Sequence, residues 1–128
     1  VAEYLQSLRV REILEPEAAF LSTDRVSPRE LHDARTALDS VRATQPYDYL
    51  EHLKCDDLVH EVFIRNCSNE VMQDTLRSLR ITTQLFEIDR LTDRLDPDSR
   101  EHDAILDALE QKVAHIRSLI RSAIAAIA

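Results

Sequence analysis

The 128-residue chain contains no glycine and no tryptophan, and only 5% of its residues are aromatic. Average usage near 7% would give about nine glycines in a chain of this length. Helices form without glycine, whereas helix ends and tight turns seldom do. Either other residues form the turns of this chain, therefore, or a loop segment is missing from the sequence. The 44% of apolar and 31% of charged residues are typical of a helical protein and exclude a disordered one.

The chain also lacks a long apolar run and a basic character. No apolar run approaches the roughly 20 residues that a membrane-spanning helix needs, and no signal peptide opens the sequence. The formal charge is −8, with 24 acidic residues against 16 Lys and Arg. Because phosphate contacts need clustered Lys and Arg, this charge argues against a nucleic-acid-binding surface in this chain.

Only two cysteines are present, Cys55 and Cys67, and both fall in one predicted helix. Their separation of 12 residues corresponds to about 18 Å along a helix. A disulfide requires Cα atoms within about 7 Å of each other, so these two cysteines are not partners. Reduced thiols are typical of a cytoplasmic protein, which is the location that we expect.

Apolar residues recur at helical spacing along the whole chain. Ser27 and Glu30 predict a capping box with Pro28 at the first helical position, and residues 96–99 (Asp-Pro-Asp-Ser) predict a break followed by a new helix. The pattern predicts an all-α bundle of five to seven helices. The expected helices cover residues 2–23 (with a kink or restart at Glu15-Pro16), 28–42, 47–65, a segment that starts near Asn69 and extends toward Ile88, and 99–128.

Two polar residues interrupt an apolar face of the helix over 47–65. Leu53, Asp56, His60 and Phe63 follow one another at spacings of three and four, which places them on one face. Burying Asp56 and His60 is costly unless each has a partner. One solution is a hydrogen bond between them. The other is a shared metal ion, because side chains one helical turn apart can converge on one cation.

A histidine also begins the apolar stripe of Ile105, Leu106 and Leu109. Alone, His102 would be read as a core residue with a hydrogen-bond partner. Together with Asp56 and His60 it completes a set of two histidines and one carboxylate, which suits Zn, Ni, Mn or Fe. His32 and His52 lie on charged faces, where we expect both to be solvated.

Four segments of the chain, taken in order and spacing, are similar to a known family. They are residues 10–19 (VREILEPEAA), residues 27–38, Asp56-Asp57-Leu58-Val59-His60 followed by Asn69, and residues 101–109 (EHDAILDAL). The chain resembles the FCD domain, the C-terminal effector-binding and dimerisation domain of GntR-type bacterial transcription regulators of the FadR subfamily. The similarity extends over nearly the whole chain, so residues 1–128 are expected to form one such domain.

The resemblance implies an antiparallel helical bundle of about six helices with an internal cavity for a metal and an effector. It implies a site of one Asp and three His, of which Asp56, His60 and His102 match by position. The family has a Gly-Asp turn and then a third His about 20 residues after the first, whereas His115 follows His102 by only 13 residues. Strict counting leaves three ligands plus water. Local similarity instead favours His115 as the fourth ligand, with eight or nine residues missing between Lys112 and Val113.

The resemblance also implies partners and a role. We expect a Zn ion, with Ni or Mn as alternatives, and a small carboxylate effector bound by Arg11, Asn69 and Arg80. We expect a homodimer that contacts DNA only through a winged helix-turn-helix domain absent from this chain, no membrane partner and no enzymatic activity. Two alternatives remain open: a metal-dependent hydrolase of a helical HD-like class, suggested by His60 and the His102-Asp103 doublet, and a metal-free dimerisation module.

Overall fold

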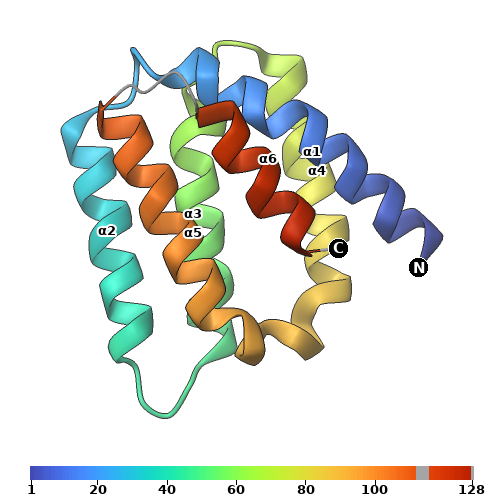
Figure 1. Cartoon of the computed structure of the whole chain (residues 1–128), viewed down its shortest axis with the longest axis vertical. Helices are drawn as coiled ribbons and strands as arrows, with labels where there is room; N and C mark the ends of the chain where they lie inside the picture. Colours follow the sequence, from blue (N-terminus) through green and yellow to red (C-terminus); the bar gives the residue numbers. More distant parts are fainter. Residues whose placement is uncertain (112–115, 128) are drawn as a thin grey trace.

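The computed structural model describes residues 1–111 and 116–127, and within these ranges every regular element is a helix (Figure 1). The all-α prediction is therefore confirmed. None of the helices in these ranges is long and apolar enough to cross a membrane. The elements are α1 (Ala2–Ser22), α2 (Pro28–Ala43), α3 (Tyr49–Arg65), α4 (Glu70–Glu87), the short 3-10 helix η1 (Ile88–Arg90), α5 (Leu91–Gln111) and α6 (Ile116–Ile127).

Polar side chains cap the N-termini of α2, α3 and α4. The Ser27 hydroxyl accepts from the Glu30 backbone N–H at 3.2 Å, and the Glu30 carboxylate accepts from the Ser27 N–H at 2.8 Å, so the predicted capping box is present. The side chains of Asp48 and Asn69 cap α3 and α4 by accepting from backbone N–H groups of the first turn. These caps satisfy amide groups that have no partner within their own helix.

Between α3 and α4, a serine occupies a turn position that is typical of glycine. Ser68 has a φ of 61°, in the left-handed region where glycine is usually found. At this junction, then, a residue other than glycine makes the turn, which is one of the two explanations considered for the glycine-free sequence.

The predicted break at residues 96–99 is wrong, because α5 begins at Leu91 and continues through Pro97. The carboxylate of Asp98, which lies inside the predicted break, accepts from Arg94 at 2.8 Å and lies 3.1 Å from His52 Nε2. Of the kink or restart expected at Glu15-Pro16, the restart is absent, since α1 is one helix with Pro16 inside it.

Helix α3 lies at the centre of the bundle and packs against α1, α2, α4 and α5. Helix α6 packs against α5 and runs beside α1 in roughly the opposite direction, as the red and blue ribbons of Figure 1 show. The expectation that eight or nine residues are missing between Lys112 and Val113 concerns a position outside the described residues. The core includes apolar side chains from all six α-helices, among them Leu8, Leu38, Val59, Phe63, Leu76, Ile105, Leu106 and Ile120.

Candidate metal and effector site

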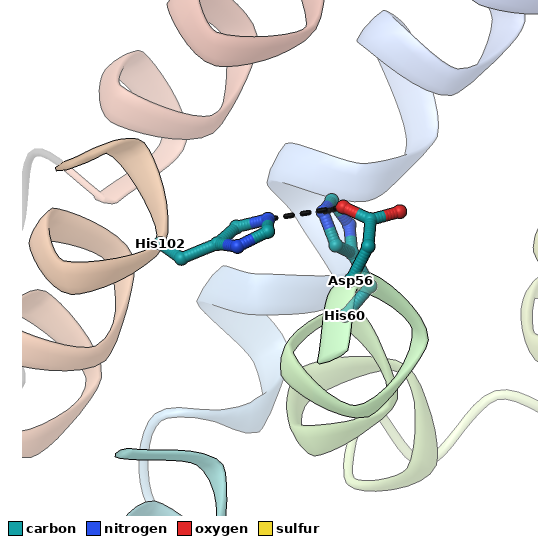
Figure 2. Close-up of side chains that lie close together, drawn as sticks. All are labelled: Asp56, His60 and His102. Carbon is teal, nitrogen blue, oxygen red and sulfur yellow. Dashed lines mark hydrogen bonds and ion pairs between the residues drawn. The ribbon is translucent and has the colours of Figure 1, made fainter. Parts of the chain in front are cut away.

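The structure brings together Asp56 and His60 from α3 and His102 from α5. Figure 2 shows the three side chains pointing toward one another from the two helices. His102 Nε2 lies 3.0 Å and His60 Nε2 lies 3.5 Å from Asp56 Oδ1. One potential ligand atom from each residue lies within 4.8 Å of the other two. Both histidines are buried, and the Asp56 side chain keeps 22% of its surface exposed.

A carboxylate that was not predicted from the sequence contacts His60 at Nδ1, the ring nitrogen that does not face the triad. Glu15 of α1 is completely buried, and its Oε1 lies 2.5 Å from His60 Nδ1. When Nδ1–H donates to Glu15, the lone pair of Nε2 faces Asp56 and His102. Metal-binding histidines are commonly oriented by such a carboxylate.

Two buried arginines balance these acidic groups. Arg80 Nη2 donates to Asp56 Oδ2 at 2.7 Å, and its Nη1 lies 3.4 Å from Glu15 Oε1. Arg11 donates from Nε to Glu15 Oε2 at 2.8 Å and from Nη1 to the Thr83 hydroxyl at 2.9 Å. The resulting network ties α1 and α4 to the triad on α3 and α5.

The network determines the charge of its members. Burial raises the pKa of the Asp56 carboxyl, but Arg80, His60 and His102 outweigh burial and hold this pKa well below its usual range. Burial likewise raises the pKa of Glu15, but the charges of Arg11 and His60 together outweigh burial and lower this pKa. For His60, burial and Arg80 lower the pKa, whereas Glu15 and Asp56 raise it and prevail. Both carboxyl groups are thus ionised at neutral pH.

A cavity of about 250 Å³ opens beside the triad. Asp56, His60 and His102 form part of its wall, and Arg11 approaches it from α1. Apolar residues form another part of the wall: Leu91, Ile105, Ala123, Ile124 and Ile127. The remaining charged lining comes from the end of α4, η1 and α5: Glu87, Arg90, Asp93, Arg94, Asp98 and Glu101.

The residues expected to bind an effector are in three different environments. Arg11 lines the cavity, while Arg80 lies behind Asp56 and is not part of the cavity lining. The structure does not bring Asn69 to this site, because its exposed side chain caps α4 by accepting from the Met72 N–H. His115 lies outside the described residues.

The prediction that His52 is solvated is wrong, and Glu15 carries a sequence signal of the kind that indicated Asp56 and His60. His52 is buried between the Tyr47 hydroxyl, 2.6 Å from Nδ1, and Asp98, rather than solvated. Arg11 and Glu15 are one turn apart on the face of α1 that also buries Leu8 and Ala18. Charged residues on an apolar face are the same signal that revealed Asp56 and His60.

A model of the FCD domain family matches residues 6–125, which is nearly the whole chain. The chain belongs to the FCD domain family. FCD domains are regulatory, effector-binding domains of GntR-type transcription regulators and are not catalytic; the regulators bind small-molecule effectors and are usually dimers. Neither the comparison with curated proteins nor the comparison with solved structures found a match.

Proposed function

We propose that this FCD domain senses a small carboxylate effector through a divalent metal held by Asp56, His60 and His102. The observation that carries the proposal is the convergence of three potential ligand atoms, within 4.8 Å of one another, on the wall of a cavity. Cavities with a few convergent polar groups are the usual sites of small ligands.

The side chains fit a metal of the Zn, Ni or Mn type. Two imidazole nitrogens and one carboxylate oxygen suit these ions, with Zn as our first choice. Glu15 favours the His60 tautomer whose Nε2 can bind a cation. Three protein ligands would leave a coordination position for water or for the effector carboxylate, and His115 remains our candidate for a fourth ligand. The bound ion would supply positive charge that attracts the carboxylate.

Regulation would follow from the position of the site between helices. Glu15 and Arg80 connect the triad to α1 and α4, so an effector that fits one arrangement of these helices better than another shifts the population toward it. In a dimer, this shift would change how DNA-binding domains elsewhere in the regulator are presented. We propose that these domains, rather than this acidic one, contact DNA in the cytoplasm.

One observation favours the metal-free alternative. Asp56 already interacts through both of its oxygen atoms, with His102 on one side and Arg80 on the other. Such contacts can stabilise a buried carboxylate without a cation. For the hydrolase alternative, the part of the chain that the structure describes offers no comparable support.

Metal content separates these alternatives. We expect purified protein incubated with Zn and desalted to retain about one Zn per chain, measured by elemental analysis. His60→Ala and His102→Ala should lose the metal, because each removes one of the ligands. His32→Ala is the matched control, since His32 is exposed on α2.

Far-UV circular dichroism of each variant would establish that loss of metal is not loss of fold. Wild-type protein that retains no Zn, Ni or Mn would favour the metal-free module. Equal metal content in His60→Ala and His32→Ala would exclude the site on α3.

A further inference from the structure

One carboxylate oxygen in the cavity lacks a hydrogen bond. Glu87 is the last residue of α4 and lines the cavity, and its Oε1 is buried with no hydrogen-bond partner among residues 1–111 and 116–127. The side chain is only 15% exposed. Leaving a buried acceptor unsatisfied is costly, and for a charged group more so. A ligand that donates a hydrogen bond at this point would remove the cost.

The nearest cation does not satisfy Glu87. Arg11 Nη1 lies 3.8 Å from Glu87 Oε1, which is beyond hydrogen-bonding distance. Arg11 instead donates to Glu15 and to Thr83. Burial raises the pKa of the Glu87 carboxyl to about 7, with Arg11 opposing and Asp56 adding to the rise. A divalent ion at the triad would favour the ionised form, because it adds positive charge to the same cavity.

The other arginines of the wall are also engaged. Arg94 donates to Asp98 at 2.8 Å and to Glu101 at 3.2 Å, and Arg90 donates to the Tyr4 hydroxyl at 3.1 Å. For a carboxylate that enters the cavity, a metal held by Asp56, His60 and His102 would therefore be the best partner. Among the described residues of the wall, Glu87 is the carboxylate that still has an unpaired acceptor for the rest of the ligand.

The charge of the lining indicates which donor fits. The described lining has carboxylates at Asp56, Glu87, Asp93, Asp98 and Glu101, against the guanidinium groups of Arg11, Arg90 and Arg94. A divalent metal brings this set to neutrality. A simple carboxylate would make the cavity negative again, whereas a ligand with both a carboxylate and an ammonium group would leave it neutral.

We propose that the effector is a small amino acid, whose carboxylate binds the metal and whose ammonium group donates to Glu87. The cavity of about 250 Å³ limits the ligand to a small molecule, and the apolar wall of Ile105, Ala123 and Ile124 fits an aliphatic side chain. This inference rests on the proposed metal and carboxylate site and adds the chemical class of the ligand.

The test uses matched acids on Zn-loaded protein. Titration calorimetry would compare alanine, valine and leucine with the corresponding 2-hydroxy acids and with propionate, isovalerate and isocaproate. We expect at least one amino acid to bind about tenfold to a hundredfold more tightly than the acid without the amine, because the added hydrogen bond is charge-assisted. The hydroxy acid should lie between the two.

Glu87→Gln should reduce this preference to less than about threefold while its Zn content stays that of wild type. Glu70→Gln, an exposed residue at the opposite end of α4, is the matched control and should keep the preference. If Glu87→Gln keeps it as well, the amine binds elsewhere, for example on the metal, and the inference is wrong.

The wild-type comparison also tests the inference without any variant. Equal binding of amino acids and plain acids would overturn it while leaving the carboxylate sensor intact. Binding of no acid to Zn-loaded protein would overturn both the inference and the carboxylate part of the proposed function. Protein that takes up no metal would instead contradict the metal site itself.

Discussion

At the scale of single residues, Glu15 connects three side chains of the site's network. Its carboxylate lies between His60 Nδ1 and the guanidinium groups of Arg11 and Arg80, and it is completely buried. Such a buried carboxylate affects stability most when it is removed, because its buried partners then lose their counter-charge. A buried guanidinium without its counter-charge is far more costly than the loss of an exposed ion pair.

Glu15→Gln should therefore lower both stability and metal affinity. We expect a loss of about 3 kcal/mol in the free energy of unfolding, measured with urea, because two buried arginines lose a negative partner. Zn affinity should fall about tenfold to a hundredfold, because the orientation of His60 is less well held.

Glu17→Gln on the same helix is the matched control for this change. Glu17 pairs with Arg117 at a half-exposed position, so its substitution should cost less than about 1 kcal/mol. Equal losses in the two variants would show that the carboxylate of Glu15 has no special part in the network.

The turn at Ser68 offers a second test at this scale. A non-glycine residue in the left-handed region carries a conformational cost that glycine does not. Ser68→Gly should raise the free energy of unfolding by about 0.5 to 1 kcal/mol. Ser78→Gly, at an exposed position inside α4, should lower it by about 0.5 kcal/mol instead. Destabilisation by both changes would contradict the conformational argument.

At the scale of the elements, the start of α2 depends on an ionised carboxylate. Burial raises the pKa of Glu30, but hydrogen bonds from the Ser27 backbone, Asn66 and Arg65 lower it from 4.5 to about 2. A pKa that is lower in the folded state means that the ionised group stabilises the fold above pH 4.5. This contribution is lost as the pH falls from 4.5 toward 2.

Glu30→Gln should accordingly be less stable than wild type at pH 7, by about 1 kcal/mol. The difference should shrink as the pH is lowered through the range below 4.5, because protonation removes the same charge from the wild type. Thermal unfolding of both proteins at steps from pH 7 to pH 3 measures this. A stability difference that stays constant between pH 7 and pH 3 would mean that the charge of Glu30 does not contribute to the capping box.

The helices also show why one predicted boundary failed. Local rules place a break and a helix start at residues 96–99, since Asp and Ser are common N-cap residues and Pro is common at the start of a helix. Asp98 instead pairs with Arg94 and with His52, which arrives from α3. The competing partner comes from 46 residues away along the chain and does not appear in any local window.

At the scale of the whole molecule, large apolar side chains remain exposed mainly on two helices. On α1 they include Leu5 and Ile13, and on α4 they include Ile81 and Leu85, which are 64% and 70% exposed. The two helices pack against each other. Because FCD regulators are usually dimers, we propose that a second copy of the chain covers these side chains.

Ile81→Asp and Leu85→Asp should then shift the protein from dimer to monomer, since each would place a charge in an apolar interface. Sedimentation velocity at several concentrations measures the change. Leu50→Asp, on the exposed part of α3, is the control and should leave the dimer intact. A wild-type monomer at high concentration, or a dimer that all three variants retain, would contradict an interface on α4.

The sequence by itself determined the all-α class, the helix starts at Ser27 and Asn69, and the family. It also indicated Asp56, His60 and His102 as a group, because helical periodicity shows which residues share a face. Polar residues on an apolar face must find partners, and this requirement can be read without coordinates. Only the tertiary structure decided who those partners are. It placed Glu15 behind His60, paired Arg80 with Asp56, buried His52 against Asp98 and left Asn69 outside the site. Periodicity is a property of one helix, whereas these contacts join helices far apart in the chain, and packing alone determines which faces meet.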